Sequence, residues 1–379
     1  MAKVKNKTKL AYNRIVIKLG TSLLTNDTSH LNHDIMAGLV AQIAGLHKQG
    51  CEIIMVSSGA IASGKDKLGL PKKVNGIPYK QVCSCVGQSR LMNTYEKLFN
   101  PFGITIAQGL LTKTNLKDRS GYLNTRNTLL ALMELGVISI INENDMVAVD
   151  EIKEAKFGDN DNLSAMVANM VDADLLLILT EVDGLFTADP HTNADAKLIP
   201  EVEHIDSSVE KLAGDTKSKL GMGGMVTKIE AARLATDSGV AVIIANGRVH
   251  EILPKIASGK KLGTLFKPGI NKLDSRDRWM LSGLSTKGKI IIDDGAAEAL
   301  KKQMRSLLAA GIKEVDGKFQ RGDIINICRV SGTLIGAGIT NYSAQDINII
   351  RGMQSQKIAT MLGCDYGAEV IHRNNLVIL

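Results

Sequence analysis

Aromatic residues are scarce in this sequence, where they make up 3% of the 379 residues and include a single tryptophan. Hydrophobic residues nevertheless account for 44% of the chain, so its core must be built from aliphatic side chains. With 22% charged residues and no internal repeat, the composition is that of a globular protein and excludes disordered or collagen-like chains. An aliphatic core favours layered α/β packing, and the length favours two domains.

Long hydrophobic runs are absent as well. Apolar runs such as Leu175–Leu179 fall far short of the roughly 20 residues that a membrane-spanning helix needs. The first 14 residues carry five basic residues and no acidic one, but the apolar stretch that follows, Ile15–Ile17, is too short for a signal peptide. We therefore expect a cytoplasmic protein without membrane contact.

The five cysteines are an odd number, and no pair has Cys-x-x-Cys spacing. This pattern favours neither a disulfide framework nor a zinc site, so we expect reduced and mostly packed thiols. The seven histidines show no spacing typical of metal ligands or of a catalytic triad. No metal site made of protein side chains is predicted.

Several common catalytic motifs are missing from the chain. It contains no GxxxxGK[ST] loop, no GxGxxG after a strand, no HRD or DFG element of protein kinases and no GxSxG. These absences argue against P-loop enzymes, dinucleotide-binding folds, protein kinases and serine hydrolases. A nucleotide site in this protein must belong to another family.

What the sequence does contain is a regular alternation of strand-like and helix-like segments up to about residue 250. Six strands are expected, at Arg14–Lys18, Glu52–Val56, Ile104–Leu111, Val137–Ile141, Leu175–Leu179 and Val240–Ala245. Helical spacing of apolar residues predicts helices at Asp34–Gln49, Leu123–Leu135, Asn162–Val171 and Thr227–Ser238. The pattern predicts an open, mostly parallel sheet covered by helices on its faces.

The alternation of strand-like and helix-like segments stops after Lys267, where a polar stretch through Arg278 has the composition of a linker. Beyond it, short strands at Lys289–Ile292, Ile324–Cys328 and Leu334–Gly338 and a helix at Ala296–Lys302 predict a small β-rich barrel or sandwich. We therefore expect domains at 1–266 and 275–379.

The two predicted domains differ in charge. Residues 267–379 hold 16 basic and 11 acidic residues, a net +5, whereas 1–266 hold 30 and 28, a net +2. A basic C-terminal domain is weak evidence for nucleic-acid binding, and the main domain gives none.

Polar residues collect directly after the predicted strands, where open α/β sheets bind their ligands. The first strand ends in Lys18 followed by Gly20, and the second leads into the small residues 57–64. Uncovered backbone N–H groups in such a turn can hold carboxylate or phosphate oxygens. The alternatives are a surface lysine and a purely structural turn.

Two clusters of carboxylates and carboxamides follow the fourth strand, at Asn142–Asp145 and Gly158–Asn162. Acids and amide oxygens accept from an ammonium, and amide N–H groups donate to a carboxylate, so the clusters suit an amino-acid zwitterion. Calcium is a poorer fit, because the spacing is not that of an EF-hand. A simple helix cap at Asn160 or Asp161 is the stronger alternative.

A second glycine-rich turn, at 221–224, precedes Lys228 and a predicted helix. Backbone N–H groups at a helix N-terminus together with a lysine form a phosphate cradle. Another polar segment, Thr180–Asp183, leaves the fifth strand. The turn is therefore a candidate phosphate site, and its pattern alone does not assign it to a nucleotide.

Six motifs follow one another along the chain: KLGTSLL at 18–24, SSGAIASG at 57–64, INEND at 141–145, GDNDNLSA at 158–165, LTEVDGLFTADP at 179–190 and GMGGMVTK at 221–228. Their order and approximate spacing resemble those of the glutamate 5-kinase family. The tail, with Gly295-Ala296, Ser306–Leu308, Gly311-Ile312 and Arg321–Asp323, resembles a PUA domain. The resemblance covers nearly the whole chain and implies the amino acid kinase fold followed by a small β-rich PUA barrel.

The resemblance also implies roles for single residues. Lys18 and Lys228 correspond to the two phosphate-binding lysines and Asp161 to the acid that orients them. The glutamate contacts correspond to Ser58, Asp145, Asp159 and Asn160. The ATP site, which includes both lysines, also takes in Thr180, Glu181, Met222, Gly223, Gly224, Met225, Val226 and Thr227.

The activity implied is transfer of the γ-phosphate of ATP to the γ-carboxylate of L-glutamate, the first step of proline biosynthesis, with Mg²⁺ bound mainly through the ATP phosphates. The resemblance further implies feedback inhibition by proline, a homodimer or homotetramer, and glutamate-5-semialdehyde dehydrogenase as a candidate partner. Acetylglutamate kinase, aspartokinase and uridylate kinase share the fold and are the near alternatives. RNA binding through the basic C-terminal domain is the distant one.

Overall fold

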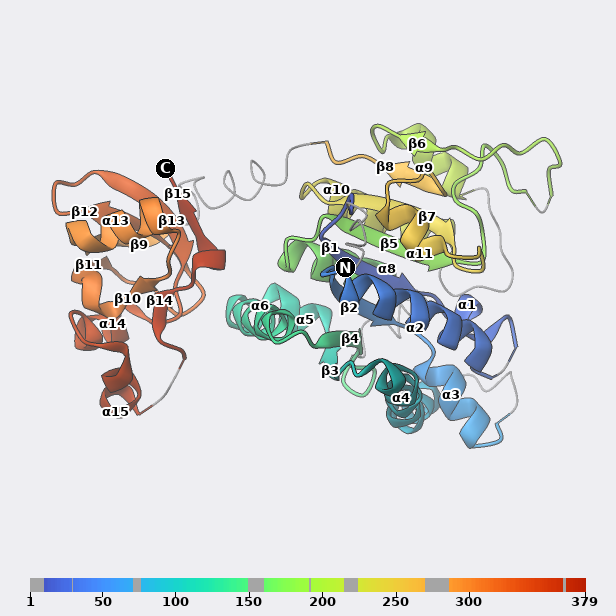
Figure 1. Cartoon of the computed structure of the whole chain (residues 1–379), viewed down its shortest axis with the longest axis horizontal. Helices are drawn as coiled ribbons and strands as arrows, with labels where there is room; N and C mark the ends of the chain where they lie inside the picture. The colour runs from blue at the N-terminus through green and yellow to red at the C-terminus, as the bar shows by residue number, and fades with distance from the viewer. Residues whose placement is uncertain are drawn as a thin grey trace, which may run out of the picture. The chain divides into compact units, whose positions relative to one another are not determined.

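The computed structural model describes residues 10–28, 30–70, 76–148, 160–190, 192–214, 224–269, 286–363 and 366–379. By its internal contacts the chain divides into two compact units, one of residues 1–114 with 126–272 and the other of residues 115–125 with 273–379. Figure 1 shows the elements of both units in chain order. Within the described residues, no helix is long and apolar enough to cross a membrane.

An eight-stranded sheet forms the centre of the first unit, in the order β3-β4-β2-β1-β5-β7-β8-β6. Its strands are β1 (Arg14–Leu19), β2 (Glu52–Ser57), β3 (Ile106–Leu111), β4 (Ile138–Glu143), β5 (Leu175–Thr180), β6 (Glu201–Val202), β7 (Ala241–Asn246) and β8 (Thr264–Phe266). All neighbouring pairs are parallel except β7 and β8, which are antiparallel. The predicted α/β class with a mostly parallel sheet is confirmed.

Helices connect these strands. They are α1 (Thr21–Thr25), α2 (His33–Lys48), α3 (Ala60–Lys67), α4 (Ile77–Phe99), α5 (Lys113–Lys117), α6 (Arg119–Glu134), α8 (Asn160–Met170), α9 (Ser207–Gly214), α10 (Met225–Thr236) and α11 (Ile252–Ala257), with a 3₁₀ turn at Asn100–Phe102. Local signals explain their ends: the Asn32 side chain accepts a hydrogen bond from the Ile35 N–H at the start of α2, and Gly136, with φ +70°, follows α6.

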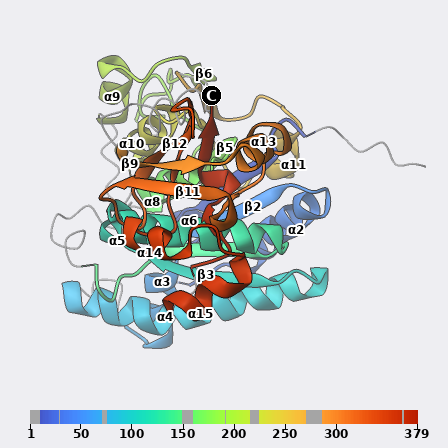
Figure 2. The same ribbon diagram turned by 90° about the vertical axis from the view of Figure 1, so that its left-hand side faces the viewer.

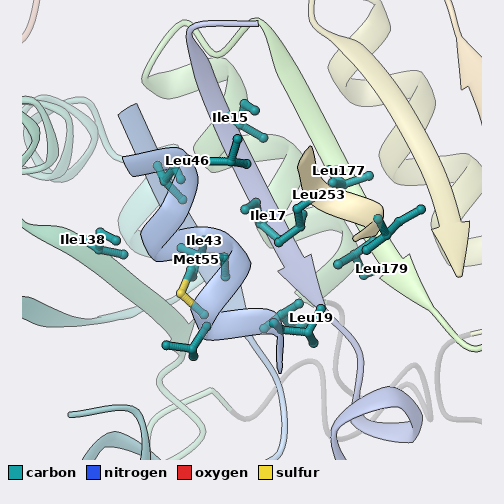
Figure 3. Packing of buried hydrophobic residues seen from close by; sticks show 14 of the residues in the cluster. Ile15, Ile17, Leu19, Ile43, Leu46, Met55, Ile138, Leu177, Leu179 and Leu253 are labelled. Carbon is teal, nitrogen blue, oxygen red and sulfur yellow. The ribbon is translucent and has the colours of Figure 1, made fainter. Parts of the chain in front are cut away.

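Aliphatic side chains from alternate positions of the central strands form the main core. Ile15, Ile17 and Leu19 of β1 are at most 2% exposed and pack with α2 and α11. Figure 3 shows Ile43 and Leu46 of α2 among these side chains, together with Leu253 of α11. Because side chains alternate along a strand, this packing leaves Lys18 on the opposite face of β1.

The second unit has a five-stranded sheet in the order β11-β9-β12-β13-β15 and a two-stranded sheet, β10-β14. Its elements are β9 (Thr286–Ile292), α13 (Asp294–Gln303), β10 (Leu307–Leu308), β11 (Ile312–Gly317), β12 (Ile324–Arg329), β13 (Leu334–Ile339), α14 (Ala344–Ile350), α15 (Ile358–Leu362), β14 (Glu369–Ile371) and β15 (Leu376–Ile378), with 3₁₀ turns at Ala309–Gly311, Ser355–Lys357 and Arg373–Asn375. Figure 2 shows β9 and β11 side by side. The predicted β-rich C-terminal domain is confirmed.

Residues 115–125 pack within the second unit although they lie far from it in sequence. Leu123 is fully buried in a small cluster with residues of that unit, namely Ile324, Ala337, Ile339 and Val377. Arg119 forms an ion pair with Asp323. The division between the units therefore falls inside helix α6, a feature that no local sequence signal marks.

Candidate active site

A buried carboxylate lies between two buried lysines. Asp161, in the first turn of α8, is 1% exposed, and its Oδ1 lies 2.5 Å from Lys18 Nζ. Its Oδ2 lies 3.4 Å from Lys228 Nζ, and the lysines are 5% and 7% exposed. Three residues from β1, α8 and α10 thus meet in one cluster. Lys18 is not the surface lysine that was the alternative interpretation.

The electrostatics of this cluster keep its acid ionised. Burial would raise the pKa of Asp161, but Lys18, Lys228 and hydrogen bonds from Lys18 and Thr227 lower it to about 2, so the carboxylate is ionised at neutral pH. Burial lowers the pKa of Lys18, while Asp161 opposes that effect and Lys228 adds to it. The buried ammonium groups of Lys18 and Lys228 suit an anionic ligand such as phosphate.

The N-terminus of α10 adds a phosphate-binding feature beside the lysines. The helix begins after Gly224, which has extended backbone angles and no side-chain cap, so the first N–H groups of the helix lack a capping side chain. Thr227 donates a hydrogen bond of 2.7 Å to Asp161 Oδ2, which ties this helix to the acid. Uncapped N–H groups and the positive end of the helix dipole favour an anion here.

Gly20 keeps the space next to the Lys18 ammonium free of side chains. A Cβ at this position would lie 3.6 Å from Lys18 Nζ and 3.5 Å from the Leu179 carbonyl oxygen. The glycine also begins α1 without a side-chain cap. A ligand oxygen can therefore approach the lysine from this side.

A chain of neutral amides and hydroxyls lies next to the charged cluster. Asn160 Nδ2 donates to Ser58 Oγ at 2.9 Å and to Asn142 Oδ1 at 3.1 Å. All three residues are 9% exposed or less. Since α8 begins at Asn160, neither Asn160 nor Asp161 precedes it as a simple cap, the alternative that the sequence left open.

Asp145 lies at the border of this amide chain. Burial raises the pKa of its carboxyl above the ordinary value of 3.8, and a hydrogen bond from Ser84 opposes the shift. Gln81 Nε2 donates to the Asp145 carbonyl oxygen at 3.0 Å and so fixes the backbone there. An acid in this position suits an ammonium group.

The remaining predicted site residues differ in burial, and some lie outside the described residues. Thr180, at the end of β5, is 3% exposed and donates to Glu181 Oε2 at 2.9 Å, whereas Val226 is 43% exposed. Glu181 acts electrostatically on Lys18 and so belongs to the same part of the site. Asp159, Met222 and Gly223 lie outside the described residues.

Two residues of the site were not predicted from the sequence. Ser84 and Gln88 of α4 are buried and contact Asp145 and Asn142, respectively. They lie four positions apart, so they occupy the same face of the helix. That face becomes recognisable once the packing of α4 is known.

Comparisons with known proteins identify the family of this chain. A family model described as "Amino acid kinase family" matches residues 13–246, and one described as "PUA domain" matches residues 288–362. A glutamate 5-kinase from Dehalococcoides mccartyi (strain ATCC BAA-2266 / KCTC 15142 / 195) is 60% identical over 368 residues, which cover 97% of this chain and 99% of that protein. The chain belongs to the glutamate 5-kinases of the amino acid kinase family.

Other members of the family are similar over the same extent. Glutamate 5-kinase from Geobacter sulfurreducens is 47% identical over 366 residues, with 97% of each chain covered. Among solved structures, UMP kinase from Bacillus anthracis aligns with 68% of this chain and 97% of its own at 16% identity and a TM-score of 0.47.

Proposed function

We infer that this chain transfers the γ-phosphate of ATP to the γ-carboxylate of L-glutamate, giving L-glutamate 5-phosphate and ADP. The observation that carries this function is the buried Lys18–Asp161–Lys228 cluster at the edge of the sheet. Membership of the glutamate 5-kinase family supports glutamate as the acceptor.

The chemistry needs charge stabilisation rather than a base. A γ-carboxylate, with a reference pKa of about 4.3, is ionised at neutral pH and can attack phosphorus directly. Negative charge spreads over the transferred phosphoryl group during in-line displacement. Lys18 on the acceptor side and Lys228 on the ATP side neutralise that charge, and Asp161 holds both ammonium groups in place.

The N-terminus of α10 and Gly224 bind ATP phosphates through backbone N–H groups, with Thr180 and Glu181 near the nucleotide. Mg²⁺ would be held mainly by the ATP phosphates, and it would supply positive charge that stabilises the transferring phosphoryl group. The charged side chains of the cluster are two lysines and one acid, so an ion at this place would be held mainly by the ATP phosphates. Both Asp161 oxygens already contact lysines.

Ser58, Asn160 and Asp145 bind the amino acid. Their donors and acceptors suit both charged groups at the α-carbon, and Asn160 is adjacent in sequence to Asp161, so the two half-sites share the first turn of α8. Proline as a feedback inhibitor, a dimer or tetramer, and an association with glutamate-5-semialdehyde dehydrogenase stay predictions from the family resemblance.

Acyl phosphate formation with four acceptors tests the function. The purified full-length protein is incubated with ATP, Mg²⁺ and glutamate, N-acetylglutamate, aspartate or UMP, and the acyl phosphate is trapped as a hydroxamate, with ADP release measured for UMP. We expect turnover with glutamate alone. Turnover with one of the other acceptors and none with glutamate would reassign the chain within the family.

A further inference from the structure

Helix α4 approaches the amino-acid pocket through two glycines. A Cβ at Gly87 would lie 1.8 Å from the Ala60 carbonyl oxygen, and a Cβ at Gly64 would lie 1.8 Å from the Cys83 carbonyl oxygen. The backbones of α3 and α4 therefore touch at a place where a methyl group would not fit. Gln88 follows Gly87 directly, so this close approach brings its side chain to the pocket.

One backbone N–H fixes the orientation of every amide in the pocket. Glu143 N–H can only donate, and it donates to the Asn142 side chain at 2.9 Å, which identifies that atom as Oδ1. The other end of the Asn142 amide is therefore Nδ2, and it donates to Gln88 Oε1 at 2.8 Å. Asn160 must in turn present Nδ2 to Asn142 Oδ1, as observed.

This polarity leaves two unused groups in the pocket. Gln88 Nε2 and Asn160 Oδ1 are both buried and have no hydrogen-bond partner in the part of the chain that the structure describes. Gln88 is 8% exposed and Asn160 is 5% exposed. One group is a donor and the other an acceptor, and their amides contact opposite ends of the Asn142 side chain. Buried polar groups without partners are rare, and such a matched pair indicates a ligand with both an anionic and a cationic group.

We propose that Gln88 binds the α-carboxylate of the amino-acid substrate through Nε2, while Asn160 Oδ1 accepts from its α-ammonium. This inference rests on the proposed function. The γ-carboxylate must lie at Lys18, where phosphoryl transfer occurs. Contacts lead from Lys18 to Asp161, from its neighbour Asn160 to Asn142, and from Asn142 to Gln88. Gln88 is therefore placed to bind the end of the substrate that is remote from the γ-carboxylate.

The neighbouring charge agrees with this assignment. Ser84, one turn before Gln88 on α4, donates to the Asp145 carboxyl, which places an acid beside the amide chain. Asp145 and Asn160 Oδ1 both favour the ammonium, whereas Gln88 Nε2 is a donor and favours the carboxylate. The Ser84 end of this helix segment thus faces the α-ammonium through Asp145, and the Gln88 end faces the α-carboxylate.

Two substitutions separate substrate contact from simple positioning. Gln88→Met removes both the acceptor for Asn142 Nδ2 and the Nε2 donor at nearly constant side-chain volume. Gln88→Glu keeps an oxygen that can accept from Asn142 Nδ2 and removes only the donor. Gln49→Met, at an exposed glutamine after α2 whose Nε2 donates to the Gly45 carbonyl, is the matched control. Melting temperature, and KM for glutamate and ATP, are measured for each protein.

We expect both Gln88 variants to raise the glutamate KM roughly 10- to 100-fold, the effect of losing one hydrogen bond to a charged group, with ATP KM and the control unchanged. Isoglutamine carries a carboxamide in place of the α-carboxylate and keeps the γ-carboxylate. Comparing it with glutamate shows whether Gln88 binds the α-carboxylate end of the substrate. Gln88→Met is expected to reduce the preference for glutamate over isoglutamine at least 5-fold.

A Gln88→Glu variant with the wild-type glutamate KM would overturn the contact and leave Gln88 as a positioning residue. An unchanged preference in Gln88→Met would overturn the α-carboxylate assignment. Should Gln88→Met fail to fold, the Gln88→Glu measurement decides alone. Wild-type protein that phosphorylates no glutamate refutes the proposed function instead, so the two failures are distinguishable.

Discussion

The phosphate half of the site and the amino-acid half are built from different chemistry. Lys18, Asp161 and Lys228 form a buried cluster of full charges, whereas Ser58, Asn142 and Asn160 form a chain of neutral groups. Full charges in a buried place interact strongly with charge that develops during a reaction. Neutral amides contribute less energy but fix direction, since each has one donor end and one acceptor end.

This contrast predicts that substitutions in the two halves change different kinetic constants. The phosphate half should determine turnover, and the amino-acid half should determine substrate affinity.

The largest effect is expected from Lys228→Ala. Because the ammonium meets charge that appears in the transition state, kcat should fall by ~10²-fold or more with little change in the glutamate KM. Steady-state kinetics against Lys260→Ala, an exposed lysine outside the site, provide the comparison. A turnover number equal to that of the wild type would remove Lys228 from the mechanism.

Asp161→Asn should also cost stability, because it leaves two buried lysines without their acid; a loss of about 3–5 kcal/mol is typical of breaking a buried pair. The pKa of Asp161 is depressed to about 2 from 3.8, so its contribution is present above pH 3.8 and is lost as the pH falls through about 2. Urea unfolding measured from pH 7 to pH 2 should show a steeper acid decline in the wild type than in Asp161→Asn. Parallel declines would contradict the assignment.

Asn160→Ala should raise the glutamate KM roughly 10- to 100-fold and leave ATP binding close to normal, because it removes neutral contacts to the amino acid. Isothermal titration with an ATP analogue and with glutamate separates the two affinities. If ATP affinity collapses and glutamate affinity does not, the two half-sites are reversed.

Acidification should weaken glutamate binding by a few fold through Asp145. Its pKa is raised by burial, so the carboxyl becomes protonated at a higher pH than an exposed aspartate and then no longer attracts the ammonium. The glutamate KM of the wild type should therefore rise on the acid side, and Asp145→Asn should show a high KM that is flat over the same range. An identical acid rise in both proteins would assign the effect to another group.

The smallest effect on chemistry is expected from a chain ending at residue 266, since every residue assigned to the reaction precedes that point. Its activity per folded molecule should equal that of the full chain. Solubility is another matter, because the cut removes the partners of Leu123 within the second unit. Replacing Leu123 by Gln in the shortened chain should improve its recovery. A folded, inactive product would show that the second unit contributes to catalysis.

Much of the architecture could be predicted from the sequence, because the signals are local. An apolar run such as Leu175–Leu179 marks a buried strand. Gly136 marks the end of a helix, because glycine readily adopts the left-handed backbone conformation found there. The short strands β6 and β8 and the long helix α4 were not predicted. Two- and three-residue strands have no period to detect, and α4 interrupts its apolar positions with serines, cysteines and glycine.

The residue types of the site could likewise be found, since Lys18, Asp145, Asn160 and Lys228 follow strands or begin helices. Their partners could not be found in that way. That Asp161 faces both lysines depends on α8 and α10 packing together on one side of β1.

Local patterns in the sequence predict six of the eight strands of the first unit, four of its helices, the aliphatic core and the kinds of polar residue at the sheet edge, because periodicity and turn chemistry act over a few residues. The tertiary structure decided which of those residues meet. Gln88 joins the pocket where Gly64 and Gly87 let two helices touch, and residues 115–125 join the second unit through the buried Leu123 and the Arg119–Asp323 ion pair. Both depend on contacts between residues far apart in the chain, which no local pattern records.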